Sequence, residues 1–68
     1  MNIIKFENPD TKEIILVEFN HQIMIVSSKL SDKVTRKKYT VSDFKTHHEW
    51  LNFLENKIGT LIETYNLL

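Results

Sequence analysis

The sequence lacks cysteine and alanine altogether, and it has only one glycine and one proline in 68 residues. Without cysteine, the chain can form neither a disulfide nor a thiolate metal site. With a single glycine, it lacks the glycine-rich loop that cradles phosphate groups. These absences exclude disulfide scaffolds, thiolate zinc domains and nucleotide-binding loops.

Long apolar runs are also missing. No segment approaches the roughly 20 apolar residues of a membrane helix. Residues 1–10 lack the basic start, apolar stretch and cleavage site of a signal peptide. We therefore expect a cytoplasmic protein with no membrane association, and the lack of cysteine agrees with a reducing compartment.

The charges balance, with nine basic and nine acidic residues. General nucleic-acid binders are usually basic, because phosphate neutralisation supplies most of their affinity. Ile, Lys and Asn, which AT-rich codons encode, are frequent, whereas Ala, Gly and Pro are rare. The composition therefore indicates a low-GC bacterium, or one of its phages or mobile elements.

Four segments rich in β-branched and aromatic residues are expected to be strands: 2–8, 13–19, 22–28 and 33–41. Turn residues separate them, at Pro9-Asp10, at Asn20-His21 and over 30–32. The fourth segment is mostly polar and lysine-rich, which is typical of an edge strand protected against further pairing.

At Ser42 the apolar period changes from two to about 3.6, which predicts an amphipathic helix over 43–66 with Ser42 as its N-cap. The stripe comprises Phe44, His47, Leu51, Leu54, Ile58, Leu61, Tyr65 and Leu68. Gly59 leaves two alternatives. One is a single helix, straight or bent at Gly59, and the other is a second short helix over 60–68. We favour one helix because the stripe keeps its phase. The fold class is α+β, with a three- to four-stranded antiparallel meander followed by a long C-terminal helix in one domain, 1–68.

The central strands are apolar on both faces, since successive side chains alternate. One helix covers one face, so a second helix, a second copy of the chain or another protein must cover the other. A domain this small has a marginal hydrophobic core, which favours stabilisation by a second copy of the chain or by another protein. We expect a homodimer or a protein partner, with an interface formed by Ile14, Leu16, Met24, Val26, Trp50 and Phe53.

Residue patterns for catalysis or metal binding are weak. His47 and His48 are adjacent, so they point about 100° apart on a helix and do not share a metal ion. The serines lie at strand ends, in a loop or at a helix cap, without a base and an oxyanion cradle. We expect no enzyme activity, no cofactor and no metal.

The strongest candidate site is the basic strand, with Lys33, Arg36, Lys37, Lys38 and Tyr39. Cations beside an aromatic ring suit a single-stranded nucleic acid. They also suit an acidic protein surface, and the alternative to both is a solvated edge strand whose charges only prevent aggregation. Trp50 and Phe53 are either core residues or aromatic anchors of an interface.

The order of elements and the segment from Arg36 to Ile58 resemble the PC4-type transcription coactivator domain. That resemblance implies four antiparallel strands and a helix, dimerisation through the helix, and single-stranded DNA binding on the sheet. The leading hypothesis is nevertheless a small accessory protein, phage-encoded or carried by a mobile element, which inhibits or modulates a protein partner by stoichiometric binding. The alternative is a PC4-like dimer that binds single-stranded nucleic acid.

Overall fold

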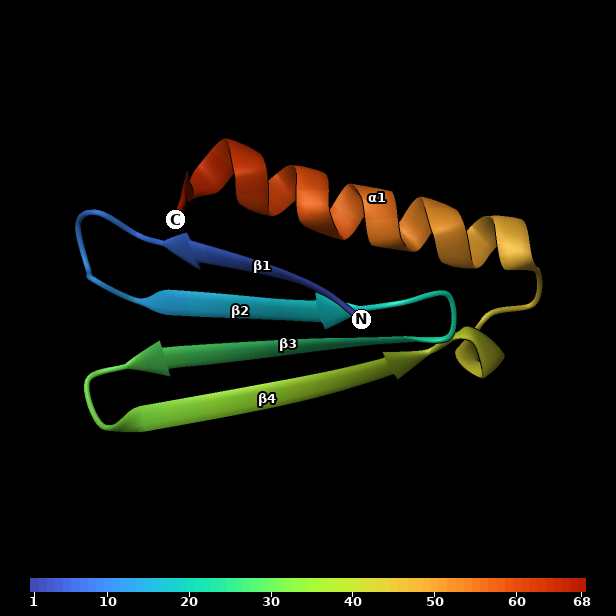
Figure 1. Cartoon of the computed structure of the whole chain (residues 1–68), viewed down its shortest axis with the longest axis horizontal. Coiled ribbons are helices and arrows are strands. Elements are labelled where there is room, and N and C mark those ends of the chain that lie inside the picture. The colour runs from blue at the N-terminus through green and yellow to red at the C-terminus, as the bar shows by residue number, and fades with distance from the viewer.

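The computed structural model describes all 68 residues as one antiparallel sheet followed by one long helix (Figure 1). Its elements are β1 (Asn2–Glu7), β2 (Ile14–Phe19), β3 (Ile23–Leu30), β4 (Lys33–Thr40), a 3-10 turn (Val41–Asp43), α1 (His47–Thr64) and β5 (Asn66–Leu67). The predicted α+β meander with a C-terminal helix is confirmed.

The strand order across the sheet is β4-β3-β2-β1-β5. The first four strands pair with their sequence neighbours, and β4 forms the predicted basic edge. The second short helix over 60–68, the alternative that the sequence left open, is wrong. The chain leaves α1 at Tyr65 and pairs Asn66 and Leu67 with β1 instead.

Short turns hold the hairpins in register. The Asn20 side-chain oxygen accepts hydrogen bonds from the backbone N–H groups of Gln22 (2.8 Å) and Ile23 (3.0 Å). Ser31 adopts a left-handed conformation with φ 55°, so that two residues close the β3–β4 hairpin. For this reason β3 extends to Leu30, two residues beyond the predicted end of that strand.

The helix begins later than its sequence pattern predicts. Thr46 is its N-cap, and the Thr46 hydroxyl accepts a hydrogen bond from the Glu49 N–H at 3.1 Å. Ser42 lies in the preceding 3-10 turn, which is closed by the Asp43 carboxylate on the Thr40 N–H (3.0 Å). Beyond its cap, α1 passes through Gly59 without a break, as expected.

The core joins one face of the sheet to α1. It consists of Phe6, Ile15, Val17, Met24, Trp50, Leu54 and Leu61. Trp50 is fully buried and donates an indole hydrogen bond to the His21 carbonyl at 2.9 Å. Leu51, which the predicted stripe placed inside, is 39% exposed. The helix is therefore rotated to bring the larger indole ring inward.

Candidate functional site: the uncovered face of the sheet

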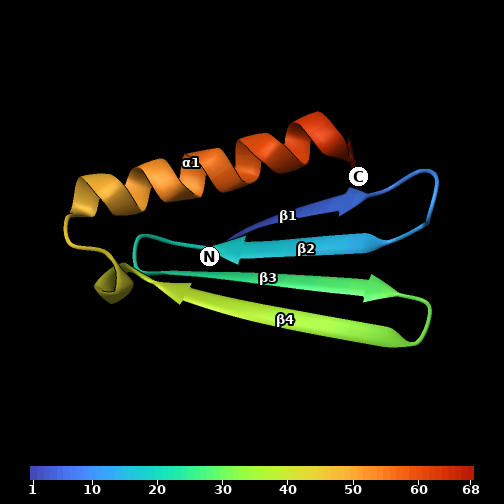
Figure 2. The ribbon, with the colours of Figure 1, turned by 180° about the vertical axis from the view of Figure 1, so that it is seen from behind.

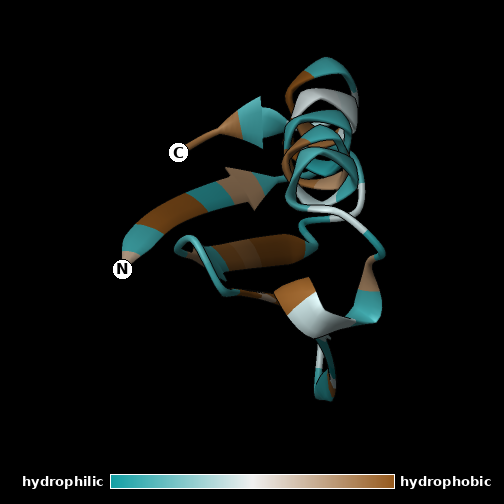
Figure 3. Ribbon diagram, turned by 90° about the vertical axis from the view of Figure 1, so that its right-hand side faces the viewer, coloured by the Kyte–Doolittle hydropathy of each residue, from teal (hydrophilic) through white to brown (hydrophobic).

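The sheet has one covered face and one uncovered face. Viewed along the strands, α1 lies on one side, and no helix lies on the other (Figure 3). From front and back alike, β4 is the strand farthest from α1 (Figures 1 and 2). All larger elements belong to this sheet or to α1, so nothing in the chain covers the second face.

Strand register decides which residues share the uncovered face. Lys5, Leu16, Ser27 and Arg36 stand opposite one another across β1, β2, β3 and β4. Because side chains alternate along each strand, the face carries Ile3, Lys5, Glu7, Ile14, Leu16, Glu18, Ile23, Ile25, Ser27, Lys29, Val34, Arg36 and Lys38.

This register corrects the expected interface. Ile14 and Leu16 lie on the uncovered face, but Met24 and Val26 do not. Val26 pairs with Val17 on the face that packs against α1, and Met24 is fully buried there. Grouping Met24 and Val26 with Ile14 was therefore wrong. Alternation within a strand is readable from sequence, but a one-residue change of register exchanges the faces between strands.

The apolar side chains of the uncovered face form a diagonal across β3 and β2, made of Ile23, Ile25, Leu16 and Ile14. Ile25 is only 9% exposed although no element covers it. Its cross-strand neighbours are Glu18 and Lys38. Long charged side chains cover adjacent apolar surface with their aliphatic stems, so Ile25 lies recessed between charged groups. The other three residues of the diagonal stay partly exposed.

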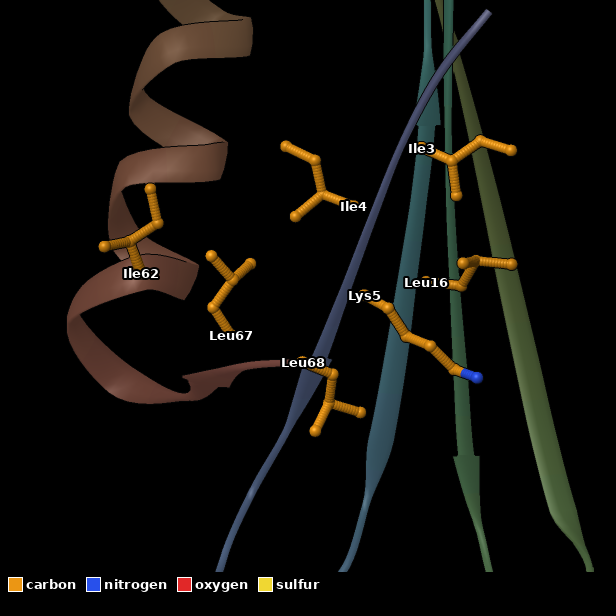
Figure 4. Close-up of a pocket in the computed structure, with 7 residues that line it drawn as sticks. All are labelled: Ile3, Ile4, Lys5, Leu16, Ile62, Leu67 and Leu68. Carbon is orange, nitrogen blue, oxygen red and sulfur yellow. The ribbon is translucent and has the colours of Figure 1, made fainter.

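Two shallow hollows meet on this face. One, of about 400 Å³, is lined by Lys5, Ile14, Leu16, Ser27, Ser28, Lys29 and Val34. The other, of about 610 Å³, is lined by Ile3, Ile4, Lys5, Leu16, Ile62, Leu67 and Leu68. Figure 4 shows the second hollow wrapping around β1, with Ile3 and Lys5 on the side away from α1 and Ile62 on the helix side. Lys5 and Leu16 line both hollows and join them into one track.

The basic strand is exposed from Lys33 to Lys38. No acidic residue stands opposite any of its four cations, because their cross-strand partners are Leu30, Ser27, Val26 and Ile25. Alternation divides these cations between the faces. Arg36 and Lys38 point to the uncovered face, whereas Lys33 and Lys37 share the side of Tyr39. The predicted basic site is thus two sites on opposite sides of one strand.

The aromatic side chains of the candidate site serve the core. The Tyr39 ring packs 4.9 Å from Phe53, and the Lys57 ammonium lies 5.9 Å from the Tyr39 ring centroid. Trp50 is fully buried, so the core role is the one that the structure assigns to it. All seven aromatic residues belong to the core cluster or pack against it. None stands on the uncovered face as a platform for base stacking.

A polar cluster joins the end of α1 to the sheet. The Glu13 carboxylate accepts hydrogen bonds from the Ser28 and Tyr65 hydroxyls, the latter at 2.8 Å. The Ser28 bond first, and then the Tyr65 bond, lower the pKa of Glu13, while the same carboxylate raises the pKa of Tyr65. Tyr65 is also the C-cap of α1. We assign this cluster to fold stability, because it fixes the helix end that leads into β5.

Metal-binding geometry is absent from the structure: no three His, Asp or Glu side chains gather to hold an ion. His47 and His48 are both exposed in the first turn of α1. No helix combines the length and apolar character needed to cross a membrane.

Sequence reasoning missed Lys5, Lys29, Ile3 and Val34 as members of the site. Lys5 follows the alternation of β1 and points away from Phe6, which was a usable signal. Lys29 had no such signal, because the expected third strand ended one residue before it.

Comparison with known proteins gives no match to a protein family, to a curated protein or to a solved structure. The likeness to PC4-type domains stays a resemblance of element order, with four strands followed by a helix.

Proposed function

We propose that this protein acts without catalysis, by stoichiometric binding of a protein partner on the uncovered face of its sheet. The observation that carries the proposal is the apolar diagonal, which crosses β2 and β3 where the chain has no further element to cover it. Removal of such apolar surface from water by a partner favours binding, by about 25 cal/mol per Å² of buried surface. The low-GC composition is the reason to look for the partner in such a bacterium, as for a phage-type regulator that inhibits or modulates a host protein.

The proposal is tested by capture from a low-GC bacterial lysate with immobilised protein. Val34 is 63% exposed on the uncovered face, so Val34→Asp removes apolar contact without disturbing the core. We expect wild type to retain a specific protein that Val34→Asp and Leu16→Asp do not retain. Leu51→Asp, on the helix, is the matched control and should retain it. Equal capture by all four proteins, or no specific capture by wild type, would contradict the proposal.

A second copy of the chain could also cover this face, because a two-fold axis near Leu16 would place two uncovered faces together. A dimer should then sediment at twice the 8.1 kDa chain mass at micromolar concentration and revert to one chain in Leu16→Asp. A species of one chain mass would leave the face to a different protein.

Single-stranded nucleic acid is the alternative function, and the unpaired cations of β4 are the observation that favours it. The lack of an exposed aromatic ring on the sheet opposes it, since base stacking supplies much of such affinity. Titration of a labelled oligonucleotide at several salt concentrations tests it. A steep decrease of log affinity with log salt is expected if phosphates bind to β4.

A further inference from the structure

The net charge of zero conceals a polarised surface. The uncovered face carries four cations, Lys5, Lys29, Arg36 and Lys38, against two carboxylates, Glu7 and Glu18. On the other side of the sheet the charges balance, with Glu49, Glu55 and Glu63 of α1 against Lys57 of α1 and Lys33 and Lys37 of β4. The face that lacks a cover is therefore positively charged, and this constrains the chemistry of whatever covers it.

The lysines are placed directly beside the apolar diagonal. Lys5 stands opposite Leu16, Lys29 opposite Ile14, and Lys38 opposite Ile25. Direct cross-strand neighbours have Cβ atoms about 4.5–5.5 Å apart. A partner side chain that contacts one of these apolar residues therefore has an ammonium group beside it. Lys5 also lies between the two hollows, at the middle of the track.

We infer that the docking element of the partner is an acidic amphipathic segment, with apolar side chains along one stripe and Asp or Glu beside them. This inference rests on the proposed function and narrows the partner to one chemistry. Apolar side chains would enter the hollows at Leu16 and Ile14, and carboxylates would approach Lys5, Lys29 and the Arg36–Lys38 side. Burial supplies the affinity, and the charge pattern supplies orientation and rate of association.

The division of β4 between two faces favours this partner over a nucleic acid. A peptide on the uncovered face meets Arg36 and Lys38, whereas Lys33 and Lys37 point to the other side. A phosphate backbone that follows the exposed edge would use the cations of both sides. Apolar residues such as Leu16 would contribute little to it.

Two labelled synthetic peptides provide the direct test. Both carry leucine at i, i+3, i+4 and i+7, the spacing of an apolar helical stripe, and the remaining positions are glutamate in one peptide and lysine in the other. Fluorescence anisotropy should show the glutamate peptide binding at least about tenfold more tightly, with affinity falling as salt screens the charges. Equal affinity, or preference for the lysine peptide, would overturn the inference.

Charge reversal on β4 gives a matched pair of variants. Arg36→Glu with Lys38→Glu changes the uncovered face, and Lys33→Glu with Lys37→Glu makes the same change in charge on the other side. The first pair should weaken binding of the glutamate peptide at least about tenfold, and the second by less than about twofold. Equal losses would show a general charge effect and would overturn the inference. Circular dichroism verifies that all variants fold.

The remaining outcomes separate this inference from the proposed function. If Leu16→Asp abolishes capture of a lysate protein but the Arg36 and Lys38 reversals do not, the inference of an acidic partner segment is wrong. The proposal that the uncovered face binds a protein is then retained. Tight binding of oligothymidylate that both β4 pairs abolish would identify a nucleic-acid surface and overturn the inference. A stable dimer that Leu16→Asp dissociates would place a second copy of the chain on the uncovered face, and this too would overturn the inference.

Discussion

The Tyr65 hydroxyl donates a hydrogen bond of 2.8 Å to the Glu13 carboxylate, although 52 positions separate the two residues. Glu13 precedes β2, and Tyr65 is the C-cap of α1. The bond therefore joins the first hairpin to the end of the helix and positions β5 against β1. Ser28, from β3, completes the cluster on the second carboxylate oxygen.

Tyr65→Phe should lower the free energy of unfolding by about 1 kcal/mol, the usual net value of one hydrogen bond. Tyr39→Phe is the matched control, because the Tyr39 ring contributes through its packing on Phe53 and keeps that contact without the hydroxyl. Urea denaturation followed by circular dichroism measures both variants. Equal stabilities of Tyr65→Phe and wild type would refute a stabilising role for the bond.

Stability should depend on pH through the same pair. The pKa of Glu13 is lowered in the folded state by Ser28 and then Tyr65, so its contribution is present above the unfolded pKa and is lost as pH falls through the folded value. The pKa of Tyr65 is raised, mainly by its bond to Glu13, so its contribution is complete below the unfolded pKa near 10.0 and is lost as pH rises further. Denaturation midpoints at several pH values should show both losses, and Tyr65→Phe should remove the alkaline one.

The phase of α1 can be tested at two adjacent residues. Trp50→Ala should destabilise the protein by about 3–5 kcal/mol, enough to unfold much of so small a domain. Leu51→Ala should cost less than about 1 kcal/mol, because Leu51 is partly exposed. Thermal and urea denaturation would show the difference. A larger loss for Leu51→Ala would restore the stripe predicted from sequence.

Helix capping gives a second pair of variants. Thr46→Ala removes the acceptor for the Glu49 N–H and should cost about 1 kcal/mol. Ser42→Ala should change stability by less than about 0.5 kcal/mol, because Ser42 is exposed and its hydroxyl bonds the Thr40 hydroxyl and caps no helix N–H. The reverse order of effects in urea denaturation would place the start of α1 at Ser42.

Gly59 offers a stabilising substitution. A Cβ atom at this position meets nothing within 4 Å, and the backbone is helical. Gly59→Ala should therefore raise the free energy of unfolding by about 0.5–1 kcal/mol, through helix propensity and a less flexible unfolded chain. A lower urea midpoint for this variant would show that the glycine has a role in packing.

The four strands and the single helix could be predicted because alternation and helical spacing depend on local geometry. The basic edge strand with Lys37 and Lys38 was also predictable, because a strand of mostly polar residues is typical of a sheet edge. The position of the helix cap was not. Ser42 and Thr46 are both good caps, and the packing of Trp50, whose indole bonds the His21 carbonyl in the β2–β3 turn, selects between them.

The sequence by itself determined the element types, the two-sided apolar character of the central hairpin and the cations of its last strand. Tertiary structure alone decided that Leu16 faces outward with Lys5 while Met24 faces the helix, and that the last residues add a strand to β1. The physical reason is that periodicity fixes which side chains of one strand share a side. Cross-strand register and helix rotation, by contrast, arise from contacts between residues far apart in the chain.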